Sequence, residues 1–172
     1  IWTVNDTLRE ITGNLEIGLQ TFDGNIKWKE NISVQIGANQ SKEVFSIRFS
    51  DLPSISMKDD FIYAVLRLDT GEELRKSYFF EEIGRLNLPT ARLAIKAIEV
   101  KSAGNENLIT LTLCSDKYAR FVKIKPLRKE IDYSDNCFDL MPGEEKKVTI
   151  KAPKGTYFQI ESRNSPPIRI TI

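Results

Sequence analysis

The chain has 172 residues, with 25 lysines and arginines against 24 aspartates and glutamates, and it contains no histidine. At about 150 residues per domain, this length predicts one domain or two small ones, and the 41% of hydrophobic residues suffices for a folded core. The balanced charge argues against binding to nucleic acid or an anionic membrane. The missing histidine excludes Ser-His-Asp and Cys-His catalysis and imidazole metal ligands within this chain.

In the first half, alternation of apolar and polar residues predicts strands at residues 14–21, 26–36, 45–49 and 61–68, and a last one ending at residues 78–80. Asp23-Gly24 predicts a two-residue type I′ hairpin, because Gly tolerates positive φ. At most one short helical turn is expected, near residues 54–60. Trp28 lies on the apolar face of its strand and is interpreted as a core residue rather than a sugar-stacking platform.

The alternation is lost from Glu81 to Thr90, and Pro89 cannot donate to a strand ladder, so we place a linker there. A second set of strands is predicted at residues 93–100, 108–114, 121–125, 133–140, 146–151, 157–161 and 168–172. Six or seven short strands in each half predict an all-β fold of tandem immunoglobulin-like β-sandwiches, with domains at residues 1–86 and 87–172.

The cysteines and the paired glutamates do not predict a catalytic site. Cys114 and Cys137 are the two cysteines; a bridge between them is left open, and two unpaired thiols are favoured. Glycoside hydrolysis needs two carboxyl groups across a pocket, whereas the adjacent glutamates lie in turns or linkers and are interpreted as solvated charges. These pairs are Glu72-Glu73, Glu81-Glu82 and Glu144-Glu145.

Three aspartates close in sequence offer oxygens that a calcium ion could use, but the loop lacks the spacing and the glycine of a calcium loop. They are Asp132, Asp135 and Asp139. We therefore predict no catalytic, cofactor-binding or metal-binding residues in the chain, and no cofactor.

Four segments, in order, resemble glycoside hydrolase family 2 β-mannosidases. Residues 133–144 (YSDNCFDLMPGE) are similar to the segment FSDNFFDLLPGE near the C-terminus of that family. Residues 1–7 (IWTVNDT) resemble the WVVND(S/T) start of the domain after its catalytic barrel. Residues 78–89 resemble its FFxxPKxLxLP linker, and residues 111–116 (LTLCSD) resemble its VTLxSD strand. Cys137 departs from the pattern, since an aromatic residue is usual there.

The resemblance implies that the chain is the last two immunoglobulin-like domains of such an enzyme, whose catalytic glutamates lie on a (β/α)8 barrel. Because the barrel is absent, we expect a catalytically silent piece of a longer protein. Its expected partner is that barrel, with no nucleic acid and no membrane; carbohydrate contact is left open but not predicted. Asn105-Glu106 matches the Asn-Glu pair that contains the acid/base residue of the family. It is expected in a turn between two strands, so the catalytic role is not transferred to Glu106.

Two alternatives stay open: a stand-alone carbohydrate-binding or adhesive β-sandwich pair, and a pair of cell-surface receptor domains. An exposed row of aromatic rings on one sheet would favour the first. A disulfide between the sheets of each domain would favour the second, and the first half has no cysteine. The sequence does not fix the compartment, although a periplasmic, secreted or lysosomal location is favoured over a cytoplasmic one.

Overall fold

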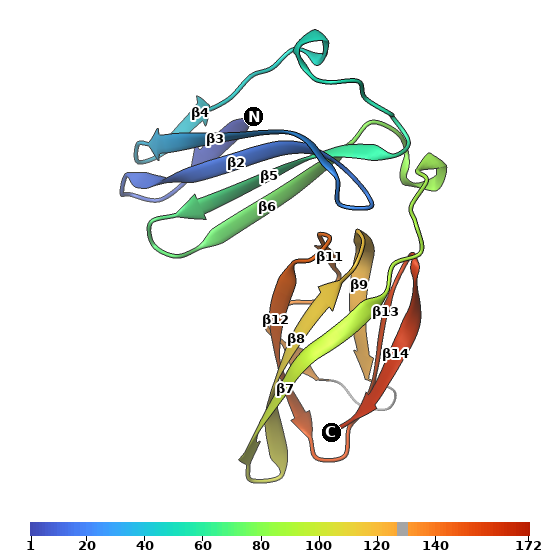
Figure 1. Cartoon of the computed structure of the whole chain (residues 1–172). Coiled ribbons are helices and arrows are strands. Elements are labelled where there is room, and N and C mark those ends of the chain that lie inside the picture. Colours follow the sequence, from blue (N-terminus) through green and yellow to red (C-terminus); the bar gives the residue numbers. More distant parts are fainter. Residues whose placement is uncertain (127–130) are drawn as a thin grey trace. The chain divides into compact units, whose positions relative to one another are not determined.

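The computed structural model describes residues 1–126 and 131–172, and the chain divides into two compact units. The first unit comprises residues 1–21 and 25–87. The second comprises residues 88–172 together with residues 22–24 of a hairpin loop. Nearly all regular structure in both units is β-strand (Figure 1). Within the described ranges, no helix has the length and apolar character needed to span a membrane.

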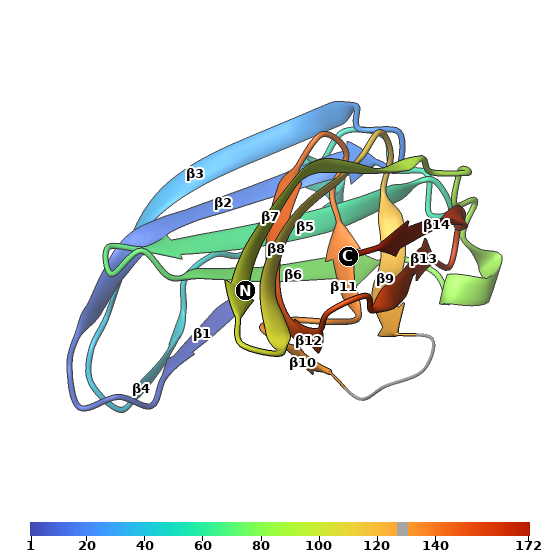
Figure 2. The same cartoon turned by 90° about the horizontal axis from the view of Figure 1, so that it is seen from below.

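The first unit contains a four-stranded antiparallel sheet in the order β3-β2-β5-β6 and a two-stranded ribbon of β1 and β4 (Figure 2). Its elements are β1 (Trp2–Asn5), β2 (Ile11–Thr21), β3 (Ile26–Ile36), β4 (Gln40–Glu43), η1 (Phe49–Asp51), β5 (Asp60–Leu68), β6 (Glu73–Phe79) and η2 (Ile83–Arg85). Because side chains alternate along a strand, Leu15 and Ile17 of β2 lie on the same face and form a core with Val34 and Leu66.

The second unit is a sandwich of two four-stranded sheets, β10-β12-β8-β7 and β11-β9-β13-β14. Its strands are β7 (Leu93–Ala103), β8 (Glu106–Ser115), β9 (Ala119–Pro126), β10 (Asp132–Tyr133), β11 (Phe138–Leu140), β12 (Glu145–Pro153), β13 (Tyr157–Ser162) and β14 (Ser165–Thr171). Alternate residues of both sheets, among them Leu111, Val148, Val122 and Phe158, meet in one buried core. The predicted all-β class is confirmed.

Two predicted strands are wrong in detail. Residues 45–49 form no strand: the ladder ends at Glu43, and Phe49 begins the 3-10 helix η1. The predicted strand over residues 133–140 is two short strands, β10 and β11, because Cys137 adopts a left-handed conformation with φ of 63°. The strands β1 and β4 are additions to the predicted set.

The predicted type I′ hairpin is also wrong. Strands β2 and β3 are joined by residues 22–25, and the Thr21 amide donates to the Asn25 carbonyl at 3.0 Å across this loop. A type I′ turn needs positive φ at both central residues, whereas Gly24 has φ of 99° and Asp23 is not in that region. The longer loop therefore uses glycine at one position only.

Candidate functional site

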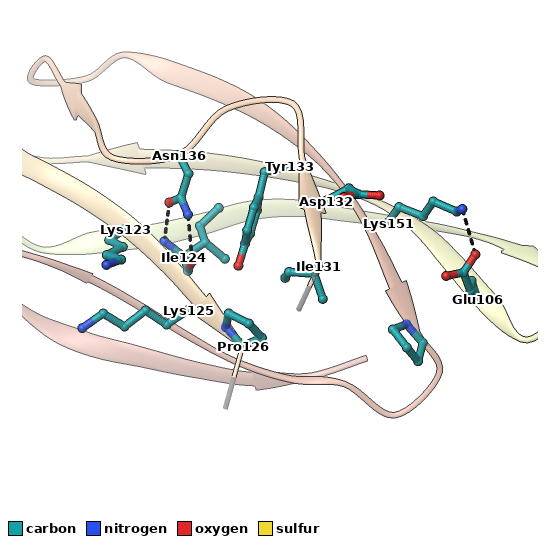
Figure 3. Close-up of a pocket in the computed structure, with 11 residues that line it drawn as sticks. Glu106, Lys123, Ile124, Lys125, Pro126, Ile131, Asp132, Tyr133, Asn136 and Lys151 are labelled. Carbon is teal, nitrogen blue, oxygen red and sulfur yellow. Dashed lines mark hydrogen bonds and ion pairs between the residues drawn. The ribbon is translucent and has the colours of Figure 1, made fainter. Parts of the chain in front are cut away.

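A hollow of about 730 Å³ opens in the second unit and is lined by residues of β8, β9, β10 and β12 (Figure 3). Tyr133 points into its centre, and Lys151 and Glu106 lie at one side. Burial, with a smaller contribution from the charge of Cys137, raises the pKa of Tyr133 to about 12. Its buried hydroxyl has no hydrogen-bond partner in the described part of the chain. This phenol therefore stays neutral at physiological pH and cannot serve as a base there.

The acidic residues of this hollow lie beside a cation. Lys151 Nζ is 2.9 Å from Glu106 Oε2, and this hydrogen bond, together with the charges of Glu106 and Asp132, raises the pKa of Lys151. A glycosidase instead needs one carboxyl held in its protonated form by an apolar or like-charged environment. Beside Glu106 lies a charge of the opposite sign instead, the ammonium group of Lys151. Glu106 is the first residue of β8, directly after the turn that contains Asn105, so the expectation that both residues lie in a turn is correct for Asn105 only.

Asn136, which also lines the hollow, has a structural task. Its Oδ1 accepts from the Ile124 amide at 2.9 Å, and its Nδ2 donates to the Ile124 carbonyl at 3.1 Å (Figure 3). The side chain thus pairs with β9 as a neighbouring strand residue would. The same Oδ1 accepts from the Cys137 amide at 3.0 Å, which fixes the left-handed residue. The side chain of Cys137 is exposed, so the departure from the family pattern at this position changes no core packing.

Asp139 stabilises an irregular backbone conformation at Phe121 in β9. Its Oδ1 accepts from the Phe121 amide at 2.9 Å, and its Oδ2 accepts from the Tyr118 hydroxyl at 2.7 Å and from the Arg120 guanidinium. Phe121 has φ of 53°, a conformation that a bulky side chain seldom adopts without such support. Asp139 is therefore committed to the fold rather than to a metal ion.

Four other carboxylates singled out in the sequence also face cations or close turns. Asp135 lies 2.7 Å from Lys146, and the Met141 amide donates to Glu144 at 3.4 Å. Glu81 and Glu82 lie 3.7 and 4.0 Å from Arg85. Over residues 1–126 and 131–172, no three His, Cys, Asp or Glu side chains gather in a way that could hold a metal ion.

Glu73 belongs to a row of alternating charges on the outer face of the first unit. Lys29 and Arg67 lie 3.2 and 3.5 Å from Glu16, and Arg67 and Arg75 lie 3.0 and 2.6 Å from Glu73. Burial alone would raise the pKa of Glu73, but Arg75 and Arg67 more than offset it and the pKa is lowered. These carboxylates are held ionised, which suits a solvated sheet face.

Both cysteines are unpaired, as the favoured interpretation had it: Cys114 is buried and Cys137 is exposed.

A second hollow, of about 480 Å³, lies in the first unit beside Trp28 and Phe45. Trp28 packs against the core formed with Leu15 and Ile17, which agrees with its interpretation as a core residue. It also forms part of the lining of this hollow, together with the charged Glu30 and the segment after β4. The interpretation of Trp28 as a sugar-stacking platform, which was set aside from the sequence, concerns this second aspect.

Comparison with known proteins gives two family matches, in order along the chain. Residues 1–83 match the model of the mannosidase Ig/CBM-like domain, and residues 89–164 match the Ig-fold domain model of mannosidases. No curated protein sequence matches the chain.

Among solved structures, the β-D-mannosidase of Dictyoglomus thermophilum is similar over 96% of this chain, with 26% sequence identity and a TM-score of 0.77. The exo-chitosanase CsxA of Amycolatopsis orientalis is similar over 99%, with 16% identity and a TM-score of 0.76, which shows the fold alone. The chain spans 20% of the first protein and 25% of the second.

Proposed function

Because the chain belongs to the immunoglobulin-like domain families of mannosidases along both of its halves, we propose that it is the C-terminal accessory region of a retaining β-mannosidase of glycoside hydrolase family 2. The ordered pair of family matches carries this proposal. The 26% identity to a β-D-mannosidase, of which the chain spans a fifth, supports it. In this role the chain leaves the chemistry to a catalytic barrel elsewhere in the protein.

The work of the chain is mechanical: it covers apolar surface of the barrel and fixes the shape of the enzyme. Apolar side chains that lie exposed near the start of the first unit support this role. Trp2 is 67% exposed, Val4 59% and Leu8 85%. Trp2 and Val4 alternate along β1 and so share one of its faces, and an exposed apolar face is typical of an interface with another domain or protein.

A turnover assay tests the claim that the chain lacks an active site. The purified 172-residue chain is incubated with 4-nitrophenyl β-mannoside, with an intact β-mannosidase as the positive control. We expect no release of nitrophenol above the buffer rate. Turnover in this chain that disappears in the variant Glu106→Gln would overturn the proposal, because a contaminating enzyme would not respond to that substitution.

The parent protein can be tested in the gene. We expect the coding sequence upstream of Ile1 to specify a (β/α)8 barrel with an Asn-Glu pair at the end of a strand. A start codon directly before Ile1, with no barrel, would contradict the accessory role. It would favour the alternative of a stand-alone carbohydrate-binding or adhesive pair.

A further inference from the structure

The hollow beside Trp28 is built by two parts of the first unit that are far apart in sequence. Trp28 and Glu30 come from β3, whereas Phe45 and Arg48 come from the irregular segment between β4 and η1, and Asp51 ends η1. The rings of Trp28 and Phe45 lie with their centroids 6.0 Å apart and their planes at 31°. The hollow thus has an aromatic wall next to charged groups.

Glu30 breaks the pattern of its own strand. The alternate residues of β3 on the core-facing side are apolar, except for this glutamate, which lies opposite the buried Ile17 in the ladder. The described residues offer it no ion pair or side-chain hydrogen bond. Glu30 is exposed, so its carboxylate is open to a ligand in the hollow.

Arg48 supplies the complementary chemistry. Its exposed guanidinium makes no ion pair with either acid of the hollow, nor with any other described residue. Asp51 Oδ1 accepts from the neighbouring Ser50 hydroxyl at 3.1 Å and keeps lone pairs for further donors. The hollow therefore offers five N–H donors from one arginine and four carboxylate oxygens from two acids.

A neutral sugar fits this combination. The C–H face of a pyranose packs on aromatic rings, and its hydroxyl groups need both donors and acceptors. Two carboxylates against one guanidinium leave the lining with a net negative charge, which disfavours phosphate and other anions. The volume of about 480 Å³ lies within the range of small-molecule sites.

We propose that the hollow formed by Trp28, Glu30, Phe45, Arg48 and Asp51 is a binding site for one ring of a neutral sugar. The site belongs to the first unit alone, so it does not depend on the proposed parent enzyme. Its role is to hold a glycan without cleaving it.

Tryptophan fluorescence tests the site directly, because Trp2 and Trp28 are the two tryptophans of the chain. The variant Trp2→Phe leaves Trp28 as the sole reporter, and the exposure of Trp2 makes this change tolerable. The variant is titrated with mannobiose, cellobiose and diacetylchitobiose. We expect a saturable change with at least one of them, at a dissociation constant of about 1 mM, since a small ligand in an open hollow gains little binding energy.

Substitutions at the hollow then locate the binding. Glu30→Gln and Arg48→Ala, each in the Trp2→Phe background, should weaken it about tenfold or more. Glu43→Ala and Arg9→Ala remove the same charges from exposed positions of the first unit and should leave it unchanged. Circular dichroism confirms that each variant is folded.

Three outcomes would overturn the proposal. One is the absence of saturable binding both by fluorescence and by titration calorimetry. Another is binding that survives unchanged in the double variant of Glu30 and Arg48. The third is tighter binding of a sulfated or phosphorylated disaccharide than of its neutral counterpart, because a negatively charged hollow would not prefer an anion.

Discussion

The side chain of Asn5 holds together one end of the first unit. Its Nδ2 lies 2.7 Å from the Arg9 carbonyl, 2.9 Å from that of Gly37 and 3.2 Å from that of Ile36. Its Oδ1 accepts from the amide and the hydroxyl of Thr7, at 3.0 and 2.7 Å. The residue is 2% exposed, so water cannot replace these bonds without a rearrangement. We expect Asn5→Ala to be strongly destabilising.

The magnitude follows from the count of bonds. The amide nitrogen has two hydrogens, so two of its three carbonyl contacts count as full hydrogen bonds, while Thr7 can turn to water after the substitution. A hydrogen bond contributes about 0.5–1.5 kcal/mol net, and a buried acceptor left unsatisfied costs about 1–3 kcal/mol. Asn5→Ala should therefore lower the free energy of unfolding of the first unit by about 2–4 kcal/mol. That is a large part of the stability of a small domain, at about 0.05–0.15 kcal/mol per residue.

Urea unfolding followed by tryptophan fluorescence measures this loss, because both tryptophans belong to the first unit. At about 1–2 kcal/mol per molar urea, the midpoint should fall by about 1–4 M. Asn31→Ala, at an exposed position of β3, is the matched control and should change the free energy by less than about 0.5 kcal/mol. Asn5→Asp should cost more than Asn5→Ala, because it sets a carboxylate against three carbonyls. An effect of Asn5→Ala no larger than the control would refute the reasoning.

Three further predictions concern single side chains. Asn136→Ala should lower the free energy of unfolding of the second unit by about 2 kcal/mol, because the N–H and C=O of Ile124 lose their hydrogen-bond partners. Circular dichroism in urea measures this loss, and Asn105→Ala, at an exposed position, is the control. Burial and the charge of Glu16 raise the pKa of Tyr63 from 10.0 to about 12, so this phenol should ionise late in an ultraviolet titration of the folded protein. The contribution of neutral Tyr63 to the free energy of unfolding is complete below pH 10 and is lost between pH 10 and 12. Tyr63→Phe should remove this part of the loss of stability at alkaline pH. An unchanged dependence of stability on alkaline pH would contradict the assignment. The exposed Cys137 should react at once with a thiol reagent and the buried Cys114 only on unfolding; equal rates would contradict the structure.

The alternation of apolar and polar residues was sufficient to predict a strand and its buried face where that strand has neighbours on both sides. In β2, the residues predicted to share a face, Leu15, Ile17 and Leu19, are 3%, 0% and 0% exposed. The same signal was misleading at residues 45–49, where Phe45, Ile47 and Phe49 alternate without a neighbouring strand. Alternation tells which side chains can share a face, not whether another strand lies within hydrogen-bonding distance. Phe45 packs on Trp28 instead.

The hollow beside Trp28 was beyond sequence reasoning for a related reason. Its second wall comes from an irregular segment, and no periodic pattern relates Arg48 to a position on β3. One signal was nevertheless present, since Glu30 is the charged member of an otherwise apolar row. An interruption of that kind, next to a tryptophan, is a sequence feature that could have indicated the site.

Residues 133–144, one of the segments that carried the family resemblance, contain polar residues and a glycine that the backbone geometry requires. In residues 133–144, Ser134 Oγ accepts from the Thr149 amide at 2.9 Å, Asp139 supports the left-handed Phe121, and Gly143 has φ of 75°. Each of these groups makes a turn or a bulge that apolar alternation cannot specify. Such a segment marks the fold of the second unit rather than a substrate, because its polar groups are used by the backbone of that unit. Residues that select a ligand are therefore to be sought outside that segment, and the site proposed beside Trp28 is lined by residues of the first unit.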